Sequence, residues 1–390
     1  MDLTVENAAL LLLVATVVAV LARRVHLPYS VGLVAAGIVL AFLPFLPRVE
    51  LTKELLFTLL LPPLIFEAAF NIDWSDLHRD LLPVITLATA GVALSAGITA
   101  IGMHFAAGWP WMASLIFGVL IAATDPVSVI ATFKESGVRG RLLLLVESES
   151  LLNDGTAAVL FSVVLAGAAG VVESPLQIGI TLLLNVGGSM LCGAVVAGAA
   201  LLLAGRTEDH LVEITLTTVA AYGSFLLGEH FHLSGVLATL TAGLMMGNLT
   251  SISDRGREAA QDFWDYAAFV SNSLVFLLIG LREARQDFKA AWLAALVAIL
   301  FVVLGRAAAV YPCCALFRWS GLRVSPNHQH ALFWGGLRGA LALALALGIP
   351  PEVPQREAIV TVSFAVVAFS VFLQGLTMTP LLRRMGEITS

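Results

Sequence analysis

Charged side chains are scarce in this 390-residue sequence: Asp, Glu, Lys and Arg together make up 12% of it, about half the share that is usual in soluble domains. Apolar residues make up 59%, and the mean hydropathy is +0.93. These values exclude a soluble globular protein and a disordered chain. The apolar runs are about 20 residues long, which is typical of membrane-spanning helices and not of the alternating, roughly 10-residue strands of an outer-membrane barrel.

Cysteine is also rare, and the three cysteines are Cys192, Cys313 and Cys314. None forms a C-x-x-C pair and all lie in apolar runs, so we interpret them as small core residues. The motif G-x-x-x-x-G-K-[S/T] is absent, so ATP-driven transport is not indicated. The N-terminal residues lack the basic region and cleavage site of a secretory signal, which predicts a permanent first span.

Hydropathy and the positions of Gly, Pro and charged residues predict one membrane domain over residues 1–390, an all-α polytopic fold with about 13 transmembrane helices. The predicted spans are Val5–Ala22, Val31–Leu46, Leu51–Phe70, Leu82–Phe105, Met112–Phe133, Leu142–Val172, Leu176–Ala204, Leu211–Gly228, Leu233–Gly247, Phe263–Leu281, Ala290–Phe317, Ala331–Gly348 and Ile359–Leu382.

The distribution of Lys and Arg among the loops predicts the orientation, because these residues are enriched on the cytoplasmic side. With the N-terminus outside, the inner loops and tail hold 13 of the 21 basic residues, and the outer loops hold 6. We therefore expect an outer N-terminus and a cytoplasmic C-terminus.

Two predicted spans contain helix-breaking residues. The fifth contains Ala-Thr-Asp-Pro at 123–126, where proline removes a helix hydrogen bond and biases the preceding residue toward extended geometry. The twelfth contains Gly-Gly-Leu-Arg-Gly at 335–339. If spans 1–6 and 8–13 are inverted six-helix repeats, the two broken helices are equivalent and cross at mid-membrane, where such transporters bind their substrate.

Ionisable residues inside spans each cost at least roughly 2.5–3.5 kcal/mol at a helix centre, so each needs a partner or a function. They are Glu67, Asp125, Glu147, Glu149, Asp154, Arg306 and Arg338. Five acids against two bases leave a negative surplus, which protons or cations must neutralise. We therefore expect a cation site and interpret the two arginines as compensating the acids.

Four polar residues of the sixth span fall at helical spacing. Ser150 and Asp154 share one helix face, and Glu149 and Asn153 share a face rotated by one residue. Hydroxyl, amide and carboxylate oxygens of this kind suit a hard cation.

Two further acids leave alternatives open. Unwinding at Asp125 frees backbone carbonyl groups and brings its carboxylate to mid-membrane, but Asp125 is also a candidate helix N-cap beside a proline kink. Glu67 follows a double proline in LLLPPLIFEAAFN. It is either an ion ligand or a surface carboxylate near the cytoplasmic end of its span.

The motifs LLPPLIFEAAF, ATDPVSV, ESLLNDGTAAVLF and GGLRGALAL closely resemble those of the cation:proton antiporter family, which contains bacterial NhaP-type and animal NHE-type Na+/H+ exchangers. The resemblance covers essentially the whole membrane domain. It implies a 13-helix inverted-repeat fold in a prokaryotic plasma membrane, a homodimer surrounded by lipid, and exchange of Na+ (or Li+) for H+. Core helices, within 82–172 and 290–382, would move against dimerisation helices, within 1–70 and 176–281. No cofactor, nucleic acid or enzymatic activity is implied, and no long regulatory tail.

The resemblance also assigns site residues by motif position. Asp154 resembles the ion- and proton-binding aspartate, and Asn153 is its neighbour in the Asn-Asp pair. The remaining proposed Na+ ligands are Ser150, the Thr124 backbone carbonyl, Asp125 and Glu67.

A second assigned group stabilises the fold around these ligands. Glu149 and Arg338 resemble the acid and arginine that hold the core helices together, and we predict that they form an ion pair. Arg306 resembles a second arginine of this kind.

The predicted mechanism is competition for one carboxylate. A carboxyl group kept from water binds a proton more readily, so near neutral pH Asp154 holds either a proton or a cation. Because Asn153 cannot titrate, the simplest cycle moves one cation against one proton without net charge. A K+/H+ antiporter of the same fold is the alternative.

Two rival classes lack their own signatures. An intramembrane aspartyl protease using Asp125 and Asp154 would carry Tyr-Asp and Gly-x-Gly-Asp motifs, and a passive cation channel would carry repeated filter loops.

Overall fold

The computed structural model describes residues 5–25, 27–42, 51–125, 140–168, 175–207, 209–249, 252–286 and 288–387, together with positions 129, 130, 133, 138 and 170. Within these ranges the chain forms helices joined by turns and short extended segments, and no strand occurs. The predicted all-α fold is therefore confirmed for the described part of the chain.

The first helices are α1 (Val5–Val25), α2 (Tyr29–Ala41), η1 (Leu55–Leu60), α3 (Leu61–Asn71), α4 (Trp74–Thr86), η2 (Leu87–Gly91), α5 (Val92–Phe105), α6 (Trp111–Leu120), α8 (Arg141–Ala168) and α9 (Pro175–Ala204). They are followed by α10 (His210–His230), α11 (Gly235–Asn248), α12 (Asp254–Glu283), α13 (Phe288–Ala315), α14 (Pro326–Trp334), α15 (Ala340–Leu347), α16 (Arg356–Phe369), η3 (Ser370–Gln374) and α17 (Gly375–Met385). The elements η1, η2 and η3 are π-helical turns that continue directly into the α-helices after them.

Every predicted span overlaps at least one of these helices. In the described residues, 7 helices are long and apolar enough to cross a membrane, and shorter apolar helices accompany them. The number of 13 spans stays a prediction.

Polar residues fix where several helices begin. Asp73, Asp209, Ser234, Ser253 and Ser325 each precede a helix, and each side chain accepts a hydrogen bond from a backbone amide two or three residues later. Such N-caps satisfy amide groups that have no partner within the helix. The start of each of these helices is therefore determined by its own N-cap residue.

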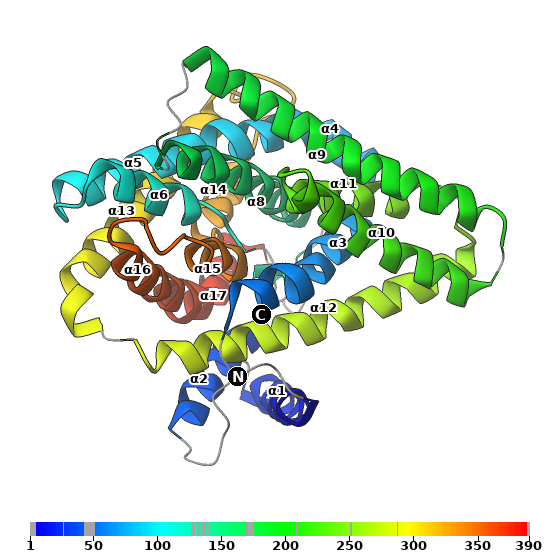
Figure 1. Cartoon of the computed structure of the whole chain (residues 1–390), viewed down its shortest axis with the longest axis horizontal. Coiled ribbons are helices and arrows are strands. Elements are labelled where there is room, and N and C mark those ends of the chain that lie inside the picture. Colours follow the sequence, from blue (N-terminus) through cyan, green and yellow to red (C-terminus); the bar gives the residue numbers. More distant parts are fainter. Residues whose placement is uncertain are drawn as a thin grey trace.

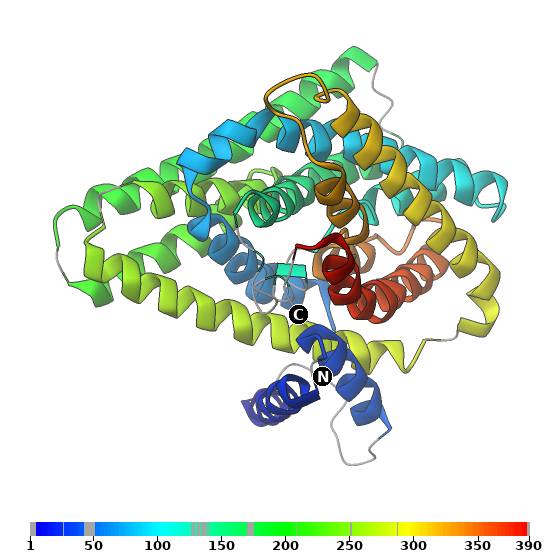
Figure 2. The same cartoon turned by 180° about the vertical axis from the view of Figure 1, so that it is seen from behind.

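The helices pack in two groups (Figures 1 and 2). In one group α2 and α3 pack against the long helix α12, while α9, α10 and α11 pack against one another and α11 against α3. In the other group α5 packs against α6 and α13, α8 against α4 and α6, and α13 against α16. The assignment of core and dimerisation helices, and relative movement between them, stay predictions.

Glycine faces backbone where α2 crosses α12. A Cβ atom at Gly37 would lie 2.3 Å from the Leu277 carbonyl oxygen, and one at Gly280 would lie 2.2 Å from the Val34 carbonyl oxygen. Small residues allow membrane helices to approach this closely. Backbone shape therefore holds α2 against α12.

The two predicted helix breaks are present and cross each other. Helix α6 ends at Leu120, and residues 123–125 are not helical. Helix α14 ends at Trp334, and α15 begins only at Ala340. The Asp125 backbone amide donates to the Leu337 carbonyl oxygen at 2.7 Å, so the two unwound segments meet directly. Pro126 lies outside the described residues.

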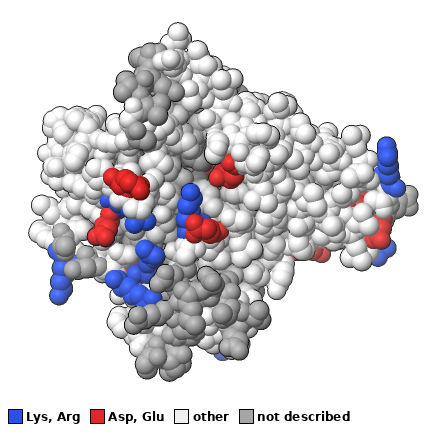
Figure 3. All heavy atoms as spheres, in the orientation of Figure 1, with Lys and Arg blue, Asp and Glu red and all other residues white. Residues whose placement is uncertain are grey.

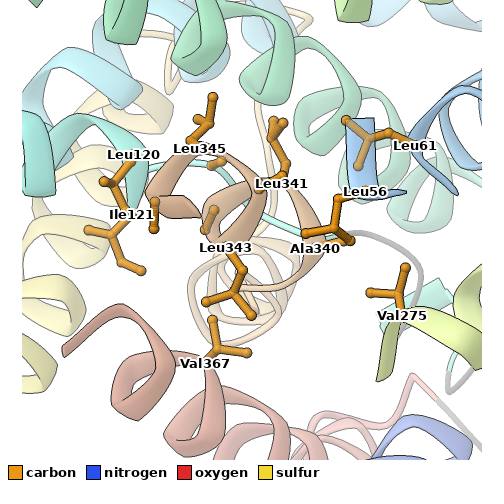
Figure 4. Close-up of a cluster of buried hydrophobic side chains, with 14 of the residues drawn as sticks. Leu56, Leu61, Leu120, Ile121, Val275, Ala340, Leu341, Leu343, Leu345 and Val367 are labelled. Atoms are coloured by element: carbon orange, nitrogen blue, oxygen red, sulfur yellow. The ribbon is translucent and has the colours of Figure 1, made fainter. Parts of the chain in front are cut away.

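Helix α15 lies inside an apolar cluster (Figure 4). Its residues Leu341, Leu343 and Leu345 are at most 5% exposed, and apolar side chains from η1, α3, α6, α12 and α16 surround it. A helix that is apolar on all sides is stable only when buried. Packing therefore holds the half-helix that follows the second break. On the face of the molecule in Figure 3, uncharged side chains cover most of the surface, and charged side chains lie in a few separate places.

Candidate functional site

A cavity of about 30 Å³ lies beside the crossing of the two unwound segments. This volume holds a water molecule or a dehydrated monovalent cation. Its polar lining comes from Thr124, Asp125 and Asp154, with Gly339 beside them. The other described lining residues are Ala123 and apolar residues of α3, α8 and α15. The crossing therefore forms a small polar site within apolar walls.

Asp154 brings an incompletely satisfied carboxylate to this cavity from the middle of α8. The residue is 8% exposed, and its Oδ1 atom has no hydrogen-bond partner among the described residues. The charges of Asp125, Glu149 and Arg338 act on it. A carboxylate in such surroundings is costly unless a proton or cation neutralises it.

Hydrogen bonds tie the first unwound segment to α8. Thr124 Oγ1 donates to Ser150 Oγ at 3.2 Å and accepts from Asn153 Nδ2 at 3.0 Å. Asn153 Nδ2 also lies 3.4 Å from Glu149 Oε1. The structure thus confirms that Glu149 and Asn153 share a helix face. It also places Ser150 in hydrogen-bond contact with Thr124, which lines the cavity.

The second unwound segment stabilises the first. Arg338 is 1% exposed, and its Nη1 atom donates to the carbonyl oxygens of Ala122 at 2.5 Å and Ala123 at 3.0 Å. These carbonyl groups follow the end of α6 and lack helical partners, and a cation is favourable at a helix C-terminus. Arg338 therefore donates hydrogen bonds to carbonyl groups that the break leaves without helical partners.

Gly339 gives the Asp125 carboxylate its space. A Cβ atom at position 339 would lie 2.1 Å from Asp125 Oδ2 and 2.5 Å from Asp125 Cβ. Both distances are far below a van der Waals contact. Glycine is therefore required if Asp125 is to line the cavity.

The predicted Glu149–Arg338 ion pair is wrong, because Glu149 pairs with Arg306. Arg306 Nη1 and Nη2 donate to the two carboxylate oxygens at 2.7 and 2.9 Å. Arg306 also donates twice to the Leu332 carbonyl oxygen at the end of α14. The sequence indicated that Arg306 and Arg338 lie within spans and that Glu149 needs a cationic partner. Which arginine pairs with Glu149 depends on how α8, α13 and α14 pack.

Glu67 is not among the described residues that line the cavity. Its Oε1 atom accepts a hydrogen bond from Asn71 Nδ2 at 2.8 Å, and Asn71 Nδ2 also lies 3.4 Å from Asp265 Oδ1 on α12. Helix α3 reaches the cavity through Leu61, Leu64 and Ile65 instead. Of the predicted ligands, the structure therefore brings together Asp154, Asp125, Thr124 and Ser150, and it leaves Glu67 aside.

Sequence reasoning missed the contacts of the glycines around Arg338. A Cβ atom at Gly336 would lie 2.5 Å from Arg306 Nε, so this glycine admits the second arginine as Gly339 admits Asp125. The Gly-Gly-Leu-Arg-Gly sequence was the available signal. It indicated a break but not the side chains that would occupy the space.

Among the described residues, no group of three His, Cys, Asp or Glu side chains is placed to hold a metal ion. A cation in this cavity would meet the two aspartates and neutral oxygen atoms. Oxygen donors of this kind suit a hard cation.

Comparisons with known proteins agree with this architecture. A family model described as the transmembrane sodium/hydrogen exchanger matches residues 9–384. The chain is 37% identical over 368 residues to the Na+/H+ antiporter ApNhaP of Aphanothece halophytica, covering 93% of this chain and 70% of that protein. It is 31% identical over 402 residues to the Na+/H+ antiporter NhaH of Halobacillus aidingensis, covering 99% and 98%. The fold is similar to that of the sodium proton antiporter MjNhaP1 from Methanocaldococcus jannaschii, with a TM-score of 0.78, 21% identity and 98% coverage of both chains.

Proposed function

Since the chain belongs to the sodium/hydrogen exchanger family, we propose that it is a secondary antiporter that exchanges Na+ for H+ at Asp154. The observation that supports this role most directly is the buried carboxylate of Asp154, whose Oδ1 atom faces no described donor beside a cavity of about 30 Å³. Such a group needs one neutralising partner at a time. A proton and a Na+ ion both meet that need, and each excludes the other.

The proposed Na+ ligands at the crossing are Asp154, Asp125, Ser150 and the Thr124 backbone carbonyl. A hydrogen bond of 3.2 Å joins the hydroxyl groups of Thr124 and Ser150, so both residues are kept close to the aspartates before an ion binds. Glu67 would join this set only in a state in which α3 has moved relative to the crossing. That displacement is what movement of the core helices against α3 and its neighbours would produce.

Alternating access follows if only the neutralised site can move past its apolar surroundings. The walls from α3 and α15 are apolar, and moving an unneutralised carboxylate along them is costly. We propose that the core helices move within a homodimer of this chain, whose fixed part comprises α1–α3 and α9–α12.

We further propose that exchange is one-for-one and electroneutral. Asn153 occupies the position beside Asp154, its amide cannot titrate, and its Nδ2 atom is used by Thr124 and Glu149. A single titrating carboxylate then binds one proton or one Na+ in each half-cycle.

We propose that the protein lies in a prokaryotic plasma membrane. The asymmetry of basic residues supports an outer N-terminus and a cytoplasmic C-terminus. Cysteine labelling at either terminus of intact cells tests this orientation.

The central test uses proteoliposomes with a trapped pH dye. In liposomes that contain the parent protein, Na+ or Li+ added outside should drive protons out of the lumen. A separate measurement with K+ tests the K+/H+ alternative. Asp154→Asn should abolish this flux while the protein stays folded, because it removes the charge and nearly keeps the volume. The matched control is Asp254→Asn, which changes an exposed carboxylate at the start of α12 and should retain flux. Substantial Na+-driven flux in Asp154→Asn would contradict the mechanism.

Stoichiometry is tested in the same liposomes by clamping the membrane potential. An electroneutral cycle should run at the same initial rate at zero potential and under a K+/valinomycin potential, because one net charge moved through 100 mV is worth about 2.3 kcal/mol. A clear acceleration under a favourable potential would exclude one-for-one exchange.

A further inference from the structure

A groove of about 800 Å³ lies on the surface between α13, α14 and α17. It shares no lining residue with the cavity at Asp154. Its lining includes the aromatic residues Tyr311, Phe333 and Trp334, and also Arg383 and Arg384 from the last turn of α17. The lining of the groove is therefore mostly apolar and carries two basic side chains.

The aromatic side chains are held in place by polar contacts at their tips. The Tyr311 hydroxyl lies 2.9 Å from His330 Nδ1, and Trp334 Nε1 donates to Thr377 Oγ1 at 2.9 Å. The rings of Tyr311 and Phe333 are 5.6 Å apart. Tyr and Trp with apolar bodies and satisfied polar tips are typical of the membrane–water boundary.

The two arginines are available to an anion. Both are exposed, and neither forms an ion pair with a described residue. The described lining of the groove contains no Asp or Glu. Two positive charges without an ion-pair partner among the described residues, in the lining of a mostly apolar groove, are complementary to a phospholipid with an anionic headgroup. Basic pockets between transmembrane helices bind such lipids.

We propose that this groove binds one anionic phospholipid, with its phosphate at Arg383 and Arg384 and an acyl chain along Tyr311 and Phe333. Trp334 is the last residue before the Gly335–Gly339 break. A lipid bound here contacts both α14 and α17, and so stabilises the broken helix at the residue where α14 ends.

The test measures quenching of tryptophan fluorescence in phosphatidylcholine nanodiscs that contain either brominated phosphatidylglycerol or brominated phosphatidylcholine. Trp334 lies in the groove, so the anionic brominated lipid should quench the parent protein more strongly. Trp334→Phe should remove this difference between the two lipids. Arg383→Gln with Arg384→Gln should weaken the preference for the anionic lipid by about fivefold per arginine, on the order of 25-fold together.

The matched control removes two other exposed arginines, Arg79→Gln with Arg255→Gln, which lie in segments assigned to the same side of the membrane. This variant should keep the preference. Equal quenching by the two lipids, an unchanged preference in the Arg383/Arg384 variant, or an equal loss in the control would overturn the proposal. Displacement of the brominated lipid by millimolar inorganic phosphate would also overturn it, because the site would then bind a free anion.

Discussion

Removing Arg306 should destabilise the protein strongly without removing any proposed ion ligand. Arg306 is 6% and Glu149 1% exposed, and their two hydrogen bonds are 2.7 and 2.9 Å long. Arg306→Met leaves the Glu149 carboxylate buried without its cation and also removes the donor to the Leu332 carbonyl oxygen. Breaking one side of a buried pair costs about 3–5 kcal/mol.

The structure also predicts how this loss can be recovered. Glu149→Leu combined with Arg306→Met replaces the pair by apolar groups, which in buried pairs is often close to neutral. The double variant should therefore be markedly more stable than either single variant. Such coupling between the two substitutions is the signature of a direct interaction.

The assay is thermal unfolding of the purified protein in detergent. At roughly 2 °C per kcal/mol for a large chain, Arg306→Met should lower the apparent melting temperature by at least about 5 °C. Arg79→Gln, which changes an arginine with a side chain 72% exposed, should leave the melting temperature nearly unchanged and serves as the control. Additive effects in the double variant, or an Arg306→Met protein as stable as the parent, would refute the assigned pairing.

Three further outcomes are expected. Gly339→Ala should abolish Na+-driven flux, because the new Cβ atom would lie 2.1 Å from Asp125 Oδ2. Gly97→Ala is the control and should retain flux, because a Cβ atom there meets nothing within 4 Å. Equal flux in the two variants would show that Asp125 is not part of the site. Ser150→Ala and Thr124→Ala should raise the Na+ concentration for half-maximal flux without abolishing transport. Thr124→Ser keeps the hydroxyl that accepts from Asn153 and should behave like the parent. A larger loss from Thr124→Ala than from Asp154→Asn would show that Asp154 is not the principal ligand. Flux should fall on the acid side, where protons occupy Asp154, and a tenfold increase in Na+ should move that limb about one pH unit lower; an acid limb that does not respond to Na+ would exclude competition.

The sequence by itself determined the membrane class, the helical fold and the positions of the two breaks. Apolar runs of spanning length leave only helices or closed barrels, and Gly335, Gly336 and Gly339 mark the second break directly. The spacing of Ser150 and Asp154 also placed both oxygen donors on one face of α8, because helical geometry converts a four-residue separation into a shared face.

Only the tertiary structure decided which distant groups meet. The bond between the Asp125 amide and the Leu337 carbonyl joins segments more than 200 residues apart, and no local pattern specifies that crossing. The partner of Glu149 is Arg306 because α13 brings its guanidinium beside α8, while Arg338 turns toward the carbonyl groups of Ala122 and Ala123. Local spacing fixes the face on which a side chain lies, but its partner depends on the packing of whole helices, to which residues throughout the chain contribute.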